Sequence, residues 1–87
     1  MGEISRLCKE AHEIARSKGW WDRERNDGEL IALMHSELSE CLQILRSGGS
    51  KERVGEELAD CLIRIFDYCE ARGIDLELSL IHISEPT

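Results

Sequence analysis

The chain has 87 residues, which is enough for one small domain with a marginal core. Its 18 acidic residues outnumber its 11 Lys and Arg residues, and the resulting net charge of −7 argues against a nucleic-acid binder. Apolar residues make up 41% of the chain without forming a run of about 18, so the sequence predicts a folded domain and no membrane span.

The first predicted element is a helix over residues 3–18, where apolar side chains recur at steps of three and four. His12 falls near the polar side of this helix, and we expect it at the surface. Gly19 ends the helix and begins a polar loop, residues 19–28, that carries Trp20 and Trp21.

Two longer helices follow, over residues 28–46 and 51–72, separated by the helix-breaking sequence SGGS at 47–50. Gly73 ends the third helix, and Asp75 has the character of an N-cap for a fourth. A single proline and 5% aromatic residues also favour helices. The sequence therefore predicts an all-α fold, an antiparallel helical bundle.

The last ten residues, LSLIHISEPT at 78–87, look like the in-frame translation of a transposase-type sequencing adapter. We therefore expect one incomplete helical domain over residues 1–77, followed by a non-native tail at 78–87. On this hypothesis the natural protein continues beyond Glu77, and its fourth helix is lost from this chain.

The four cysteines have spacings that contain no C-x-x-C motif, and each falls on an apolar helical position: Cys8, Cys41, Cys61 and Cys69. We expect reduced core residues of a cytoplasmic protein. The charged N-terminal segment also differs from a secretory signal peptide.

Acidic side chains occupy unusual places on the second and third helices. On a helical wheel, Glu37 lies inside the apolar arc of 28–46 and Glu40 lies at its edge. Glu57, Asp60 and Asp67 line one border of the wide apolar arc of 51–72. Arg64 lies between these three on the wheel, and we expect it to pair with one of them.

Each helix therefore carries two carboxylates at i and i+3, which share one face. Antiparallel packing across the SGGS turn would bring four carboxylates together, and they would repel one another without a cation. Oxygen ligands of this kind suit Mg²⁺, with Mn²⁺ as the alternative. Partly exposed carboxylates paired with arginines remain the other interpretation, with Arg53, Arg64 and Arg72 as partners.

Three segments also carry a resemblance to a known family: KGWWD at 18–22, HSELSECL at 35–42 and EELADCLIRIFDYCEARGIDLE at 56–77. They resemble the MazG-like branch of the all-α nucleoside triphosphate pyrophosphohydrolases, whose hallmark is E-E-x-x-E followed by E-x-x-D. Ser36 stands in place of the first glutamate of that hallmark. The remaining hallmark positions are matched by Glu37, Glu40, Glu57 and Asp60.

The resemblance implies that these four carboxylates hold Mg²⁺ and that the protein hydrolyses a nucleoside triphosphate to a monophosphate and pyrophosphate, as a house-cleaning enzyme of the nucleotide pool. It also implies that Asp67 faces the substrate, and it strengthens the prediction that Trp20 or Trp21 stacks on the base. A chain that lacks the family's C-terminal segment is expected to be a weak or inactive enzyme. The wide apolar arc of 51–72 predicts a homodimer or homotetramer.

Two alternatives stay open at this point. One is a non-catalytic acidic helical module that serves only for dimerisation, which would not need Glu37 inside an apolar arc. The other is a related hydrolase of the same superfamily that acts on a phosphoribosyl-nucleotide.

Overall fold

The computed structural model describes the backbone of residues 2–84 and the side chains of residues 2–82. Within this range the chain forms four helices and no strand: α1 (Glu3–Ser17), α2 (Asp27–Arg46), α3 (Lys51–Ala71) and α4 (Leu76–Ser84). The prediction of an all-α fold is confirmed. The first three helices begin and end within one residue of the bounds predicted from the sequence.

Local capping explains where α2 and α3 begin. The Asn26 side chain accepts a hydrogen bond from the Glu29 backbone N–H at 2.8 Å, and the Ser50 hydroxyl accepts one from that of Arg53 at 3.2 Å. Between the two helices, Gly48 adopts a φ of 75°, a left-handed conformation that favours glycine. The SGGS sequence thus forms the predicted turn.

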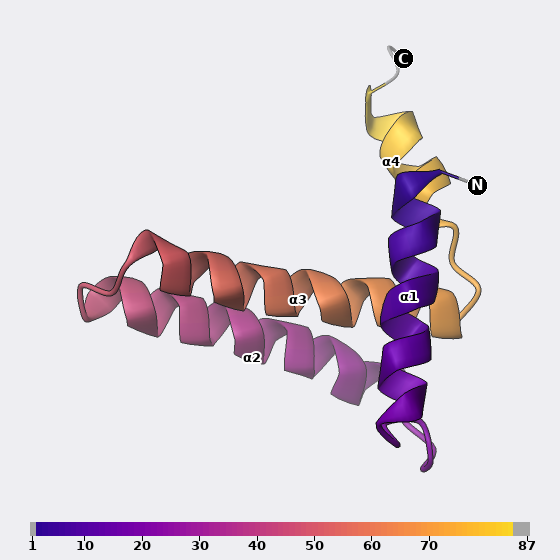
Figure 1. Cartoon of the computed structure of the whole chain (residues 1–87), viewed down its shortest axis with the longest axis horizontal. Helices are drawn as coiled ribbons and strands as arrows, with labels where there is room; N and C mark the ends of the chain where they lie inside the picture. Colours follow the sequence, from indigo (N-terminus) through magenta and orange to yellow (C-terminus); the bar gives the residue numbers. More distant parts are fainter. Residues whose placement is uncertain (1, 85–87) are drawn as a thin grey trace.

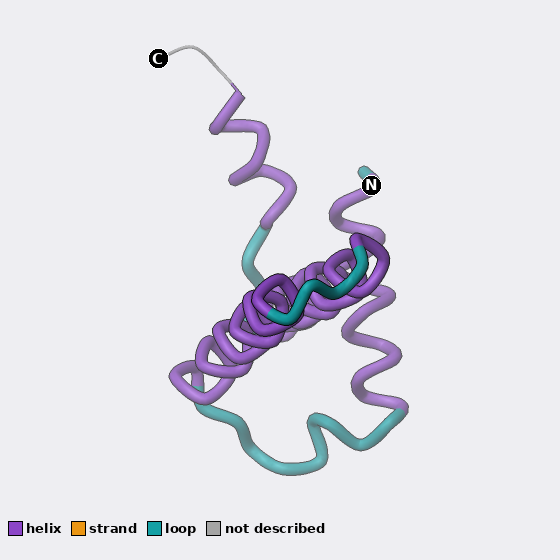
Figure 2. Tube along the Cα trace, turned by 90° about the vertical axis from the view of Figure 1, so that its left-hand side faces the viewer, coloured by secondary structure: helices purple, strands orange, loops and turns teal. Residues whose placement is uncertain are grey.

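Helices α2 and α3 lie side by side as an antiparallel hairpin, and α1 crosses α3 near its C-terminal end (Figure 1). Viewed along the hairpin, the long connection from α1 to α2 loops away from the helices before α2 begins (Figure 2). The molecule measures 41 × 39 × 22 Å because α1 and α4 project across one end of the hairpin.

The core is small and consists largely of short side chains. Its apolar members, spread over the first three helices, are Cys8, Ala11, Leu30, Cys41, Ile44, Cys61 and Cys69. All four cysteines are buried and free, as the sequence predicts, and the Cys61 thiol lies 3.7 Å from the Met34 carbonyl oxygen across the α2–α3 contact. Two acidic side chains, Glu37 and Asp67, are buried with them.

The fourth helix differs from the expectation that it would be lost. Asp75 caps it as predicted, because its carboxylate accepts a hydrogen bond from the Leu78 backbone N–H at 3.0 Å. The helix then continues through the adapter-like string to Ser84, since no glycine or proline interrupts the sequence before Pro86. Residues 85–87 of that string lie outside the described residues.

Among the described residues, no helix combines the length and the apolar character that crossing a lipid bilayer requires.

Candidate metal centre and adjoining cleft

Glu37 is the most buried acidic side chain on α2. It lies on the side of the helix that packs against α3, together with Cys41 and Ile44, and only 8% of its surface is exposed. Its Oε1 atom accepts a hydrogen bond from Arg64 Nε at 3.0 Å. The prediction that Glu37 lies within the apolar stripe of its helix is therefore confirmed, and a cation of α3 pairs with it.

Arg64 itself pairs differently from the expectation. The sequence suggested a partner on its own helix, but the structure pairs it with Glu37 of α2. The reason is the helix packing, which brings Glu37 of the neighbouring helix against the border of α3 that carries Arg64.

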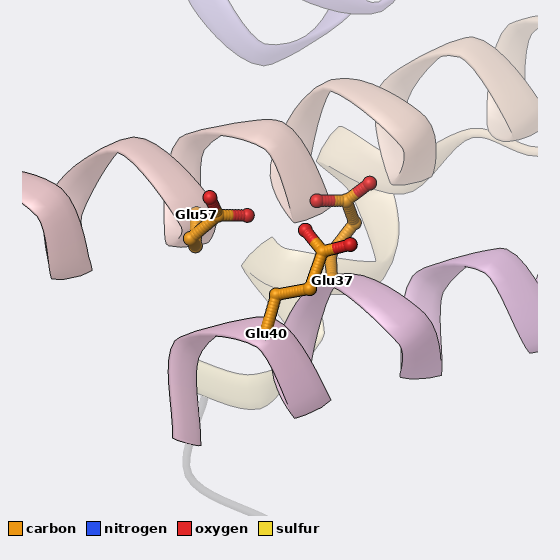
Figure 3. A group of neighbouring side chains, drawn as sticks. All are labelled: Glu37, Glu40 and Glu57. Atoms are coloured by element: carbon orange, nitrogen blue, oxygen red, sulfur yellow. The ribbon is translucent and has the colours of Figure 1, made fainter. Parts of the chain in front are cut away.

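Three of the four predicted metal ligands converge. Glu37, Glu40 and Glu57 each offer one carboxylate oxygen, and these atoms all lie within 4.8 Å of one another. Figure 3 shows the three side chains pointing toward one another across the space between α2 and α3. One turn of α2 supplies two of the ligands, and α3 supplies the third.

Asp60 lies outside this group of three. Its side chain is exposed, one turn along α3 from Glu57, and it lines the adjoining cleft. It is nevertheless near enough for its charge to contribute to the raised pKa of Glu57. Asp60 remains a predicted ligand that the structure places beside the cluster.

Glu57 is the electrostatically strained member of the cluster. Its Oε2 atom is buried and has no hydrogen-bond partner among the described residues. A hydrogen bond to Glu40, burial and the charge of Glu40 together raise the pKa of Glu57 from 4.5 to about 7. Because its neighbours are carboxylates that cannot donate when ionised, this oxygen requires either a proton or a cation.

A cleft of about 730 Å³ adjoins the carboxylates. The hairpin contributes Glu37, Asp60 and Arg64 to its charged lining. The loop after α1 adds Trp20 and Arg25 to the lining. The apolar wall comes from α1 and α3 and includes Leu7, Ala11, Ile14, Ile63 and Phe66. A space of this size, lined by apolar side chains and several charged groups, suits a nucleotide-sized ligand.

Of the two predicted base-stacking residues, Trp20 is the one that lines this cleft. The Arg25 guanidinium lies 3.6 Å from the centroid of its ring, and that of Arg64 lies 5.5 Å away. Arg25 also donates a hydrogen bond from Nε to the Trp20 carbonyl oxygen at 3.0 Å. These contacts hold the ring at the edge of the cleft.

Trp21 instead takes part in a buried polar contact. Its indole N–H donates to Asp67 Oδ1 at 2.9 Å, and the His12 Nδ1 atom lies 2.8 Å from the same oxygen. Asp67 is only 7% exposed, although it also borders the cleft. The structure thus gives Asp67 two partners within the protein, and its contact with a substrate stays a prediction.

His12 is the residue that sequence reasoning misplaced. The expectation of a surface histidine is wrong, because the side chain of His12 is only 20% exposed. Its ring packs edge-on against that of Trp21, with 5.6 Å between the two ring centroids. The sequence does hold a signal, since His12 lies one turn after the buried Cys8 and directly follows the buried Ala11.

No family model, curated protein or solved structure compared with this chain gives a match.

Proposed function

We propose that this protein is a Mg²⁺-dependent nucleoside triphosphate pyrophosphohydrolase. The observation that carries the proposal is the convergence of three carboxylates around the buried, unpartnered Oε2 atom of Glu57. A divalent cation would satisfy that oxygen and relieve the repulsion among the three side chains. An all-oxygen donor set fits Mg²⁺, and Mn²⁺ as its substitute.

In this proposal Glu37, Glu40 and Glu57 hold the cation, with Asp60 available from the next turn of α3. The bound ion supplies neutralisation of phosphate charge and a more acidic water. Water joins one phosphorus of the α–β linkage and the bridging P–O bond breaks, which yields a nucleoside monophosphate and pyrophosphate. Glu40, the exposed member of the cluster, would accept the proton that this water loses.

The cleft supports a nucleotide as the substrate. Its lining includes Glu37 of the proposed cation site together with Trp20, on whose aromatic ring a base could stack. Arg25, Arg64 and Lys18 place positive charge along the lining of a protein whose net charge is −7. These cations would offset the repulsion of a polyanionic substrate.

The test is pyrophosphate release from a panel of ribo- and deoxyribonucleoside triphosphates, with and without Mg²⁺. Glu37→Gln should abolish any Mg²⁺-dependent release and any stabilisation of the fold by Mg²⁺. The matched control is Glu56→Gln, which changes the same charge at an exposed position next to Glu57 and should behave like the wild type. Absence of both pyrophosphate and a Mg²⁺-dependent melting shift in the wild type would contradict the proposal.

A dimerisation module is the second candidate function, and one observation favours it. Leucines stay exposed along the hairpin: Leu38, Leu42, Leu45, Leu58 and Leu62. We infer that a second copy of the chain covers this face, whether or not the protein is an enzyme. A module without catalysis would retain this association and show neither metal binding nor hydrolysis.

We also infer a cytoplasmic location, because the four buried cysteines are free and a reducing compartment keeps them so.

A further inference from the structure

We propose that Arg64 is a positioning residue that exchanges partners, pairing with Glu37 when the cation is absent and with the anionic substrate when the cation is bound. This inference rests on the proposed function, because it requires a cation in the carboxylate cluster. In this inference, the side chain of Arg64 couples the binding of the cation to the binding of the substrate.

Arg64 is the cation that the fold supplies to the cluster. In the part of the chain that the structure describes, it alone forms an ion pair with Glu37, Glu40 or Glu57. The pair joins a side chain that is one-third exposed to one that is almost fully buried. Glu37 is anchored in the helix contact, so Arg64 is the partner that is free to move.

Most of the hydrogen-bonding capacity of Arg64 is unused. Its Nε donates to Glu37, whereas its two terminal nitrogens, which carry four of its five N–H donors, make no hydrogen bond to the described part of the chain. Arg25, the neighbouring arginine of the cleft, is already committed to Trp20 and Glu29. Arg64 lines the cleft, so its free donors are available to phosphate oxygens.

Electrostatics then dictates the exchange. A divalent cation on the cluster competes with the guanidinium for the negative charge of Glu37 and repels it. Removal of the Arg64 charge should therefore strengthen cation binding, while it removes donors from the substrate and weakens substrate binding. A residue that only supported the local packing would weaken both.

The experiment measures binding rather than turnover. Mn²⁺ alone is titrated into the wild type, Arg64→Gln and Arg46→Gln, with free Mn²⁺ followed by electron paramagnetic resonance. Arg64→Gln should bind Mn²⁺ roughly two- to fivefold more tightly, the factor expected for loss of a competing, partly exposed ion pair. Arg46 is an exposed residue of α2 without an ion pair in the described structure, so Arg46→Gln controls for net charge and should match the wild type.

A second titration adds the manganese complex of inorganic triphosphate to Mn²⁺-saturated protein. Arg64→Gln should bind it roughly tenfold more weakly than the wild type. A folded Arg64→Gln protein that binds Mn²⁺ no more tightly than the wild type overturns the inference. Tighter Mn²⁺ binding with unchanged triphosphate binding also overturns it, because Arg64 would then compete with the metal without serving the substrate.

Failure of the proposed function would give a different result. If neither the wild type nor any variant binds Mn²⁺, the proposed cation site is wrong and both proposals fall together.

A measurement on the wild type covers the case in which Arg64→Gln does not fold. The ¹⁵Nε resonance of Arg64 should shift on saturation with Mg²⁺, and a resonance that stays in place while Mg²⁺ binds overturns the exchange of partners.

Discussion

At the scale of single residues, Glu57 determines how the carboxylate cluster responds to pH. Its buried Oε2 atom has no partner, and the adjacent Glu40 makes ionisation of Glu57 unfavourable. When it holds a proton, Glu57 can donate a hydrogen bond to Glu40. When it is ionised, the cluster contains only mutually repelling acceptors, which is the condition that a bound cation would relieve.

A pH-dependent loss of stability should follow from this residue. The pKa of Glu57 is raised from 4.5 in the unfolded chain to about 7 in the metal-free fold, so the folded state binds the proton more tightly. Its contribution is fully present below pH 4.5 and is lost as the pH rises through about 7. Glu57→Gln should therefore gain stability relative to the wild type between about pH 5 and about pH 8, as measured by urea unfolding in EDTA.

Glu56→Gln serves as the control, because Glu56 is exposed and its substitution should change the free energy of unfolding equally at about pH 5 and about pH 8. Millimolar Mg²⁺ should remove most of the difference between the wild type and Glu57→Gln at the higher pH by stabilising only the wild type. A Glu57→Gln difference that is the same at both pH values would show that Glu57 keeps an ordinary pKa in the fold.

Residue patterns predicted which carboxylates lie at the helix contact better than they predicted the partners of those carboxylates. The position of Glu37 inside an apolar arc indicated that its side chain is buried, because helical periodicity places it there whatever α3 does. The identity of its partner, Arg64, depends on how α2 and α3 face each other. The contact of His12 and Trp21 with Asp67 depends on where α1 crosses α3, which periodicity does not encode.

At the scale of helices, the boundaries were predictable because the chain marks them chemically. Gly19, Gly48 and Gly73 have positive φ values and follow the first three helices, while Asn26 and Ser50 cap the second and third. The crossing of α1 over α3 was not predictable, since side chains distant in sequence create it. Another contact between segments distant in sequence joins α4 to the start of α1.

That contact is a cap supplied from another helix. The N-cap residue of α1 is Gly2, which has no side chain to offer, and Glu77 of α4 accepts hydrogen bonds from the backbone N–H groups of Ile4 at 2.9 Å and Ser5 at 3.1 Å. Its negative charge also lies at the positive end of the α1 dipole. Glu77 thereby ties together the two helices that lie across the end of the hairpin.

Glu77→Ala should lower the free energy of unfolding by about 1 kcal/mol, the usual cost of a lost N-cap. Glu77→Gln should cost less, because an amide oxygen can still accept both hydrogen bonds although it lacks the charge. Urea unfolding provides the measurement, and Glu13→Ala, at an exposed position of α1 without an ion pair in the described structure, provides the control. Equal stability of Glu77→Ala and Glu13→Ala would mean that the cap contributes nothing.

At the scale of the whole molecule, the chain is too open for a compact monomer of its size. Its radius of gyration is 14.5 Å, against about 12 Å expected for 87 residues. Its accessible surface is 6299 Å², against about 5200 Å² expected for a monomer of 9.9 kDa. The excess of roughly 1100 Å² exceeds the ~800 Å² that each partner buries in a protein interface of standard size.

Part of the exposed surface is apolar, and leucines of the hairpin contribute to it. Leu38, Leu42 and Leu45 follow directly after the buried Glu37, Cys41 and Ile44, and Leu62 follows the buried Cys61. Each helical residue is rotated by about 100° from the one before it. Because the two helices are antiparallel, the residues that directly follow the contact positions turn toward the same side of the hairpin in both helices. The leucines therefore form one apolar face, whereas Glu40 and Asp60, which directly precede the contact residues Cys41 and Cys61, turn toward the opposite side.

Association through this face is the last prediction. The wild type should run as a dimer or tetramer in light scattering at tens of micromolar, and Leu42→Lys combined with Leu62→Lys should shift it toward the monomer, because two charges would be buried in an apolar interface. The same substitution at the similarly exposed Leu80 of α4 controls for added charge and should leave the mass unchanged. A wild type that is monomeric at this concentration would rule out the second copy as the partner of this face. Retention of Mn²⁺ binding in the dissociated variant would further show that α2 and α3 of a single chain suffice for the cation site, since all three converging carboxylates belong to one hairpin.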